Sequence, residues 1–472
     1  MPAAYHAWQR LQREVVLGGT CTHCGTCVGL SKGSLRMEET SAGPLPVPAR
    51  DDVHLPPEAY QACPGKGIDY PDAYRALHGA LPANWLLGCY RQVYVGHAAS
   101  PTIRRRAASG GVITQTLLYL LDRGQIDGAV VLQQGQPEPW LARPIIASNR
   151  EEIIAASQSV YVPVAVNTIL PQMEAFDGRL AYVGLPDQVA ALRRLQREGH
   201  QGACKVDFVL GPYVGTGIYL GAIESFLRSN GIRDIREIAS LKYREGEWPG
   251  HLEIRTRSGR TLRAEKFYYN YLIPFYVTQA TLQAVDFTNE LTDISVGDAW
   301  HPSYESRGQG YSVVVVRTTQ AEAVLDEMQR EGILVLEPTT VTEALSMHGH
   351  MLDFKKRGAF IRNEWRRLLG KEAPSYGYRP EQIPLSRKVV EFFIVLLFAT
   401  CRTRPARRLV EWVALGVLGP IFDFLRRSWK SASKPVKRKG LHQVTFVPVD
   451  TDNGSYEGDS SQESLTANQH AK

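Results

Sequence analysis

Short apolar runs alternate with longer amphipathic segments through the central part of the chain. Short runs bounded by turn residues predict buried strands, and apolar positions three and four apart predict helices. Strand, turn and helix in alternation predict an α/β sheet that binds its ligand at the carboxyl ends of its strands. The expected strands are 129–132, 180–183, 205–214 with its glycine-rich turn, and 311–317, and the expected helices are 112–121, 188–197 and 320–331.

Two strongly apolar segments, 389–400 and 409–425, follow this region. Each segment contains an acidic residue and has fewer than the roughly 20 consecutive apolar residues that a helix needs to span a bilayer. Basic residues lie between and after them, so we expect 385–439 to form an amphipathic helical hairpin in the plane of an anionic membrane surface. The alternative is a hairpin that dimerises or docks onto the core. Residues 440–472 are rich in Ser, Asp, Asn and Gln and are expected to be disordered.

The distribution of charge sets the C-terminal region apart. The formal net charge is +6, but residues 387–439 alone hold thirteen Lys and Arg against three acids. The remainder is about neutral to slightly acidic, which argues against a nucleic-acid enzyme and favours one basic segment that faces a partner. The first 16 residues lack the apolar stretch of a secretory signal. Because the cysteine usage also indicates a reducing compartment, we expect a cytoplasmic protein, attached peripherally to the inner face of the membrane.

Cysteine spacing gives the strongest chemical signal. Cys21, Cys24 and Cys27 are three positions apart, and a distant Cys63 is followed by proline. This split of three and one is typical of a 4Fe-4S cluster, and structural zinc, which usually pairs its ligands as two C-x-x-C units, is the alternative. We predict one cluster on these four residues, in a module of residues 1–95 that orders around it. The remaining thiols are expected in the core or as incidental residues: Cys89, Cys204 and Cys401.

A small-residue turn, Ser109-Gly110-Gly111, precedes the expected helix that contains Thr114. The free N–H groups at the start of such a helix favour a phosphate or another anion. Taken alone, this pattern is also typical of an ordinary helix start.

Several polar stretches allow more than one interpretation. Residues 286–300 are rich in Asp and also aromatic, so they form either a capped surface turn, which composition favours, or a segment that lines a site. His348 and His350 are expected at the solvent or at the rim of a substrate site. Lys355-Lys-Arg357 is expected to be a solvated face or a docking patch for an acidic ferredoxin.

Together these stretches resemble the beta-subunit family of coenzyme F420 hydrogenases and dehydrogenases, which also includes 7-hydroxymethyl chlorophyll a reductase and a class of divinyl chlorophyllide vinyl reductases. The resemblance spans residues 21 to about 330. The pieces that carry it are the four cysteines with Cys63-Pro64-Gly65, Ala108-Ser109-Gly110-Gly111-Val112, Ile126-Asp127-Gly128, Tyr161-Val162-Pro163, Val183-Gly184-Leu185-Pro186, Trp248-Pro249-Gly250 and Glu290–Asp298.

The resemblance implies a flavoprotein in which one 4Fe-4S cluster relays single electrons to FAD, and FAD passes electron pairs to an organic substrate. It implies a ferredoxin-like iron-sulfur module, then a mixed α/β flavin-binding domain over 96–380, with a ferredoxin-like protein as electron donor. The C-terminal amphipathic helical segment lies outside the resemblance. The residues implied near the flavin are Ser109, Gly110, Gly111, Thr114, Tyr161, Gly184, Pro186 and Asp298.

Departures from the family pattern are also informative. Many relatives carry cysteines where this chain has Asp187, Thr281 and Ala284, and near Val214, so a second cluster is expected to be absent because these residues cannot replace thiolates. A lysine common in relatives is Val160 here, which argues against deazaflavin reduction. Asp187 could protonate a substrate, and the alternative is an aspartate that caps the helix from 188.

Three functions remain open at this point. The first is a membrane-attached iron-sulfur flavin reductase. The second is an electron-transfer subunit that feeds a partner complex and has no substrate site of its own. The third is a binding protein for a lipid-linked or glycan intermediate that keeps a structural cluster.

Overall fold

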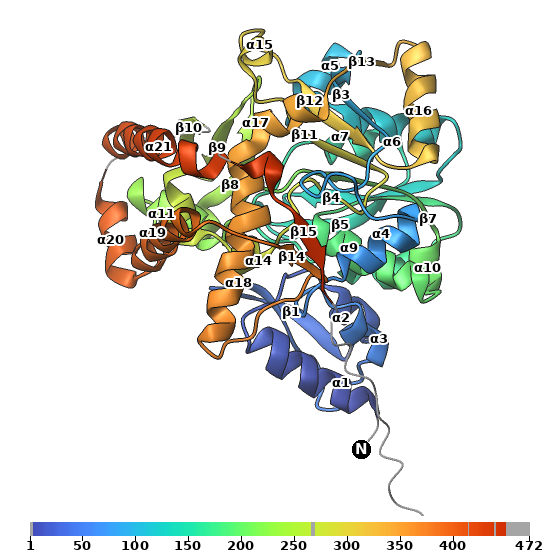
Figure 1. The fold of residues 1–472 in the computed structure, drawn as a ribbon, viewed down its shortest axis with the longest axis horizontal. Helices are drawn as coiled ribbons and strands as arrows, with labels where there is room; N and C mark the ends of the chain where they lie inside the picture. Colours follow the sequence, from blue (N-terminus) through green and yellow to red (C-terminus); the bar gives the residue numbers. More distant parts are fainter. Residues whose placement is uncertain (1–2, 266–269, 414, 439, 450–472) are drawn as a thin grey trace, which may run out of the picture.

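The computed structural model describes residues 3–265, 270–413, 415–438 and 440–449. Its centre is an eight-stranded mixed sheet in the order β13-β3-β12-β11-β7-β6-β4-β5 (Figure 1). The strands are β3 (Gln92–Ala98), β4 (Gly128–Gln134), β5 (Ala142–Ala147), β6 (Leu180–Val183), β7 (Val206–Pro212), β11 (Ile294–Asp298), β12 (Ser312–Val316) and β13 (Leu334–Pro338). The mixed α/β class predicted from the sequence is confirmed, although β3 crosses the domain boundary expected at residue 95.

Five strands of this sheet have their carboxyl ends at the same edge. β4, β6, β7 and β11 pair in parallel, and β12 is antiparallel to both β11 and β3. β3 therefore runs in the same direction as β11, so the carboxyl ends of β3, β4, β6, β7 and β11 share one edge. In open α/β sheets this is where ligands bind.

Alternating side chains of the strands build two apolar layers. Val313 and Val315 of β12 belong to one core, and Val314 and Val316 belong to the other. This is the two-residue period of a strand that is buried on both faces. The first face packs against α4 (Tyr70–His78), α8 (Leu170–Ala175), α9 (Pro186–Arg197), α10 (Gln201–Cys204) and α17 (Val341–Asp353), and the second against α5 (Pro101–Arg106), α6 (Val112–Asp122), α7 (Arg150–Ala155) and α16 (Thr319–Arg330).

The N-terminal module is small and packs around its own apolar cluster. Trp8, Leu11, Val15 and Leu55 are buried there, and the side chains of Cys21, Cys27 and Cys63 border them. Its elements are α1 (Ala3–Leu11), η1 (Gln12–Val16), α2 (Thr26–Leu30), the antiparallel pair β1 (Leu35–Thr40) and β2 (Gly43–Pro48), and α3 (Pro57–Gln61).

A second, three-stranded sheet has a separate apolar core. β8 (Ile238–Glu245), β9 (His251–Thr256) and β10 (Thr261–Glu265) pair antiparallel in the order β10-β9-β8. Helices pack around the same core. They are α11 (Gly221–Ser229), η4 (Asn270–Leu272) and α13 (Ile273–Tyr276).

The C-terminal region forms three helices where the sequence predicts a two-helix hairpin. They are α19 (Leu385–Cys401), α20 (Arg404–Trp412) and α21 (Leu415–Arg438), which lie together at one side of the molecule (Figure 1). None of the helices in the described residues is long and apolar enough to cross a bilayer. After α21 the chain returns, and β15 (Phe446–Pro448) pairs antiparallel with β14 (Tyr378–Pro380). Residues 440–449 are thus built into the fold, contrary to the disorder expected there, and 450–472 lie outside the described residues.

Charged side chains are buried where α17 continues through the π-helical turn η5 (Phe354–Gly358) into α18 (Ala359–Leu368). Lys355, Lys356 and Arg357 are 1%, 0% and 1% exposed, so the predicted solvated face or docking patch is wrong. The segment predicted as a surface turn is also buried, since Asn289 and Glu290 are fully covered. Composition could not reveal the burial of these two segments, because a charged stretch is ordinarily assigned to the solvent-exposed surface.

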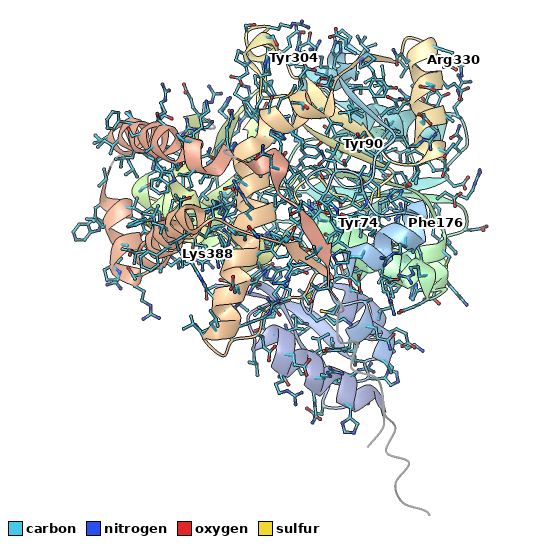
Figure 2. The ribbon with its side chains drawn as sticks, in the orientation of Figure 1. Tyr74, Tyr90, Phe176, Tyr304, Arg330 and Lys388 are labelled. Atoms are coloured by element: carbon cyan, nitrogen blue, oxygen red, sulfur yellow. The ribbon has the colours of Figure 1, made fainter. Side chains whose placement is uncertain are left out.

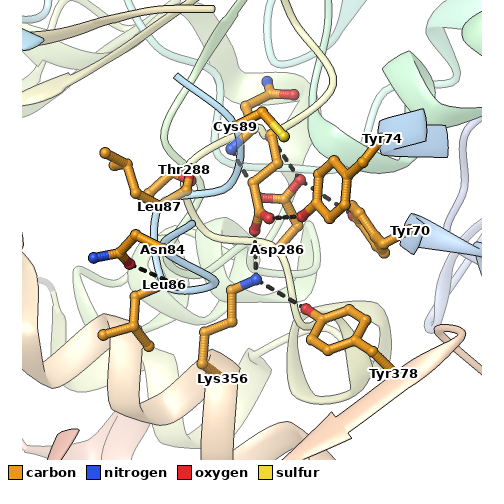
Figure 3. A network of polar contacts seen from close by, with 12 residues as sticks. Tyr70, Tyr74, Asn84, Leu86, Leu87, Cys89, Asp286, Thr288, Lys356 and Tyr378 are labelled. Carbon is orange, nitrogen blue, oxygen red and sulfur yellow. Dashed lines mark hydrogen bonds and ion pairs between the residues drawn. The ribbon is translucent and has the colours of Figure 1, made fainter. Parts of the chain in front are cut away.

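The buried charges form a paired network (Figure 3). Lys356 Nζ lies 2.6 Å from Glu290 Oε1 and donates to the Tyr378 hydroxyl at 2.8 Å. Tyr74 donates to the other oxygen of Glu290, and Tyr70 donates to Asp286 at 3.1 Å. Partners on distant segments therefore satisfy each charge.

Loss of one partner should expose the energetic importance of this network. We expect Lys356→Met to lower the free energy of unfolding by about 3–5 kcal/mol, because Glu290 would stay buried without a cation. Urea titration followed by tryptophan fluorescence measures the change. The double variant Lys356→Met/Glu290→Gln should recover part of the loss.

A surface pair of the same length provides the control for this prediction. Arg36 lies 2.6 Å from Glu38, and both side chains are about half exposed. Arg36→Met should therefore change the free energy of unfolding by less than about 1 kcal/mol. An equally small effect of Lys356→Met would contradict the importance given to the buried pair.

Candidate functional site

The four predicted cluster cysteines line one hollow in the N-terminal module. Cys21, Cys24, Cys27 and Cys63 border a small hollow that is partly open to solvent. Cys21 and Cys24 precede α2, Cys27 lies in its first turn, and Cys63 follows α3. Apolar neighbours include Leu11, Val15, Met37 and Pro46.

Two glycines allow the cysteine loops to approach each other and the central domain. Gly25 has φ +84°, and a Cβ there would lie 2.9 Å from the Cβ of Ala165. A Cβ on Gly65 would lie 2.5 Å from Val15 Cγ1 and 3.0 Å from the Thr20 carbonyl oxygen. The backbone around the hollow therefore requires glycine at both positions.

Ionisation of the thiols in the hollow is unfavourable when no cation is bound to them. Burial raises the pKa of each of the four, and repulsion from the neighbouring thiols adds to this for Cys21, Cys27 and Cys63. For Cys63 the pKa rises to about 12. Bound metal would offset both effects, since coordinated thiolates lose their protons. The donor set therefore fits an iron-sulfur cluster.

Asp187 lies between this hollow and the buried charge network. Its charge acts on the thiols of Cys21 and Cys24. Burial raises the pKa of Asp187 to about 6, against the opposing effect of the Lys355 ammonium. Asp187 is in the first turn of α9, whose N-terminal capping residue is Leu185, so the alternative role as the helix cap is wrong.

Lys355 is the cation that faces Asp187 and was not predicted as a site residue. Its ammonium donates to the Thr281 carbonyl oxygen at 2.9 Å. Burial lowers the pKa of Lys355 to about 7, and the Asp187 carboxylate opposes this shift. No sequence signal marked it, because a run of three cations is typical of a solvated face.

The predicted Ser109-Gly110-Gly111 turn follows β3 and α5 and leads into α6. Ser109 Oγ donates to the Tyr311 carbonyl oxygen at 2.8 Å, and the Gly110 N–H donates to Ser312 Oγ at 2.9 Å. These two groups are therefore occupied within the protein. Gly111 precedes α6 with φ +81° and no side chain caps this helix, whose first turn holds Thr114. The N–H groups at the start of α6 are the ones suited to an anion.

Arg104 of α5 lies beside the start of α6. A Cβ on Gly111 would be 3.3 Å from Arg104 Cα. The Arg104 guanidinium stacks on the Tyr311 ring at 4.5 Å and donates through Nε to Gly310. Its buried Nη2 has no hydrogen-bond partner. The run of three arginines before the glycine turn was the signal that sequence reasoning missed.

Asp298 reaches the same edge at the end of β11. It accepts from Arg244 Nη1 at 3.1 Å and from Trp248 Nε1 at 2.9 Å. In the sheet Asp298 pairs with Ser312, whose hydroxyl contacts the Ser109 turn. Asp298 and Ser109 are thus brought together through β12.

The remaining predicted residues follow β6 or lie near β7. The Gly184 carbonyl oxygen accepts from Asn289 Nδ2 at 2.8 Å, and Pro186 begins α9. The Tyr161 carbonyl oxygen accepts from the Ile218 N–H at 3.0 Å, and its ring meets the Tyr243 ring at 5.4 Å. Apart from Tyr161, which packs with the core of the three-stranded sheet, the predicted cofactor residues lie at the carboxyl ends of β3, β6 and β11 or in the segments that follow them.

A second hollow of about 200 Å³ lies beside Tyr161 and is lined by Val160, Trp140 and Tyr243. The Ser109 turn and Asp298 line neither of these two hollows. The Ser109 turn and Asp298 are therefore linked through Ser312 and not through a shared hollow.

His348 is not solvated, which was one of the two environments predicted for it. It is 5% exposed and lies between the rings of Tyr213 and Phe287, at 5.3 Å and 5.2 Å. Burial lowers the pKa of His348 to about 4. It is therefore a core histidine and not a solvated one.

Comparison with known proteins places this geometry in a family. The chain is 24% identical over 338 residues to the coenzyme F420-dependent sulfite reductase of Methanocaldococcus jannaschii, covering 68% of this chain and 48% of that protein. It thus spans about half the length of that relative. It is also 24% identical over 263 residues to the coenzyme F420 hydrogenase subunit beta of Methanothermobacter thermautotrophicus, covering 54% of this chain and 86% of the subunit.

A chain of the F420-reducing [NiFe] hydrogenase complex from Methanosarcina barkeri is similar with a TM-score of 0.49 and 20% identity, covering 62% of this chain and 98% of that one. Residues 93–171 match the family described as coenzyme F420 hydrogenase/dehydrogenase, beta subunit N-term. Residues 177–342 match the C terminus of the same subunit, so the two matches cover more than half of the chain. The chain therefore belongs to the coenzyme F420 hydrogenase/dehydrogenase beta-subunit family.

Proposed function

We propose that this chain is an iron-sulfur flavoprotein reductase. One 4Fe-4S cluster on the four cysteines of the hollow would receive electrons from a ferredoxin-like protein, and FAD would serve an organic substrate. The observation that carries the proposal is the convergence of four thiols on one hollow beside Asp187, next to the carboxyl edge of the sheet. The named relatives, a hydrogenase subunit and a sulfite reductase, support redox chemistry in general.

The spacing of the thiols supports a cluster over zinc. Zinc holds four sulfurs about 2.3 Å from one ion, so the sulfurs crowd around a point, whereas a cluster binds each thiolate to a different iron. In the sequence the four cysteines divide as three and one, and all four line a single hollow. This division favours the cluster, because zinc sites usually pair their ligands as two C-x-x-C units.

For FAD, the residues that would hold the phosphates are the N-terminus of α6 and Arg104. The positive end of α6 and the unpaired Nη2 of Arg104 both favour an anionic group. When bound, FAD can accept electrons singly and deliver them as a pair. Ser109 and Gly110 would act indirectly, because their bonds to Tyr311 and Ser312 fix the turn that aims the α6 N–H groups.

Asp187 is the proposed proton donor. Reduction of an organic substrate by an electron pair also consumes protons, and a carboxyl group with a pKa near 6 can supply them close to neutral pH. Lys355, with its pKa lowered to about 7, is the cation whose charge opposes the rise in the pKa of Asp187. The chain therefore holds a carboxyl group and an ammonium group with shifted pKa values close to the cysteine hollow.

A second candidate is an electron-transfer subunit of a larger complex. The match to a hydrogenase beta subunit covers 86% of that subunit, whereas the match to the sulfite reductase covers 48% of that protein. The two candidates differ in whether the isolated chain reduces an organic acceptor without a partner protein.

The cluster is tested by metal content after anaerobic purification. We expect iron and sulfide in a ratio near one, with visible absorbance and an EPR signal after reduction. Cys63→Ala should lose most of the iron, because one corner of the cluster loses its ligand. Cys204→Ala changes an exposed thiol and should keep it. A colourless wild-type protein that holds only zinc would rule out the proposed electron path and leave the intermediate-binding function.

The phosphate site is tested by titration of FAD into flavin-free protein. Arg104→Gln should weaken FAD binding about tenfold or more, since hydrogen bonds to charged groups contribute about 1.5–3 kcal/mol. The exposed Arg106, two residues away, provides the matched control, and Arg106→Gln should leave the affinity within about twofold. Binding of coenzyme F420 in place of FAD would contradict the flavin assignment.

The role of Asp187 predicts a pH dependence. With reduced viologen as donor and an organic two-electron acceptor, the rate should fall as the pH rises through about 6, because Asp187 loses the proton that it donates. Asp187→Asn should lower the rate and remove this dependence. Asp207→Asn, at an exposed position, should preserve it. A wild-type pH profile that persists in Asp187→Asn would assign the proton to another group.

A further inference from the structure

Helix α19 is inverted relative to an ordinary surface helix. Its inward side carries charge beside the buried Ile394, since Arg387 and Glu391 are both 0% exposed. Its outward side is apolar at positions that recur every three or four residues. These exposed side chains are Leu385, Val389, Phe392, Phe393, Leu396 and Leu397. A soluble surface helix normally turns such a stripe toward the core.

Ion pairs to the protein core hold α19 in this orientation. Arg387 Nη2 lies 2.9 Å from Asp353 Oδ2 of α17 and 2.8 Å from Glu391 Oε2. Glu391 also pairs with Arg362 of α18. Near the same contact, Lys388 lies 3.7 Å from Glu364 of α18 (Figure 2). Rotation of α19 would break buried ion pairs, so the apolar side stays outward.

The neighbouring helices extend the exposed apolar surface. α20 and α21 both contact α19. Leu409 and Trp412 of α20 are 66% and 86% exposed. On α21 the exposed apolar residues again follow helical spacing. They are Val417, Ile421, Phe424, Leu425 and Trp429. Most of the large apolar side chains exposed in the described residues lie on these three helices, which contact one another. Exposed apolar side chains gathered in this way mark an interaction surface.

Basic side chains accompany this surface, and its acids are neutralised. All three acids of the segment are paired: Glu391 as above, Glu411 with Arg228 at 2.8 Å, and Asp423 with Arg426 at 2.6 Å. The exposed cations of α20 and α21 include Arg404, Arg408, Arg427, Lys430 and Lys434. The surface is therefore apolar and positive at the same time.

We propose that α19, α20 and α21 form a docking surface for the headgroup region of a bilayer that contains anionic lipid. The apolar side chains would enter the boundary of the acyl chains while the arginines and lysines meet the phosphates. A second copy of this chain is the rival occupant. A two-fold contact would bring the two basic surfaces together, and like charges across an interface oppose association. This attachment is independent of the redox function proposed above.

Flotation of the full-length protein with vesicles tests the proposal. We expect the protein to float with vesicles of phosphatidylcholine and phosphatidylglycerol, and not with phosphatidylcholine alone. Added salt should weaken the binding. Phe392→Ser/Leu396→Ser should lower the partition coefficient about tenfold or more, because two apolar contacts are lost. The matched control is Leu368→Ser/Leu369→Ser, at 77% and 72% exposed positions at the end of α18, which should float as the wild type does.

Charge reversal provides an independent measurement. Arg404→Glu/Arg408→Glu should lower binding to anionic vesicles at least about fivefold, since each cation near such a surface contributes roughly 1 kcal/mol. An unchanged melting temperature shows that each variant is folded. Equal flotation with neutral and anionic vesicles, or flotation that no variant changes, overturns the proposal. A wild-type dimer that Phe392→Ser/Leu396→Ser dissociates, without any vesicle binding, also overturns it and assigns the surface to a second copy.

Discussion

The structure depends on one electrostatic constraint, which is that a charge inside the protein must have a partner. Glu290, Asp353 and Glu391 are fully covered, and each contacts a basic side chain. An isolated buried charge would be prohibitively costly, whereas a paired and hydrogen-bonded one is tolerated. The elements that carry these residues are therefore held in position relative to each other by charge pairing as well as by apolar contact.

Much of this pairing originates from the single π-helical turn η5. Its three consecutive cations reach different parts of the molecule: Lys355 faces Asp187, Lys356 pairs with Glu290, and Arg357 pairs with Asp353. In any helical turn, three consecutive side chains point in different directions. In η5 all three are buried, so the protein surrounds this turn. The side chains of the five-residue turn η5 thus link the cysteine hollow, the sheet and the C-terminal helices.

The sequence contained most of the secondary structure but little of this network. Apolar periodicity located β4, β6, β12 and α16 within a few residues, because burial on both faces leaves a continuous apolar run. Cysteine spacing predicted the four thiols that line one hollow, since three of them lie within a short segment. Lys355 and Glu290 could not be assigned, because their burial depends on partners that are distant in sequence. Arg104 had a local signal, but its position beside the start of α6 required the fold.

The pairing of β14 with β15 changes how the three C-terminal helices behave mechanically. Phe446 of β15 packs against Trp85 and Tyr378, with ring centroids 6.0 Å and 5.7 Å apart. The segment from 385 to 438 is therefore fastened to the body at both ends and cannot swing as a flexible tether. Any large object that these helices bind takes up a fixed angle and distance relative to the central sheet. Binding of such an object by the three C-terminal helices would therefore fix the orientation of the whole molecule as well as raise its local concentration.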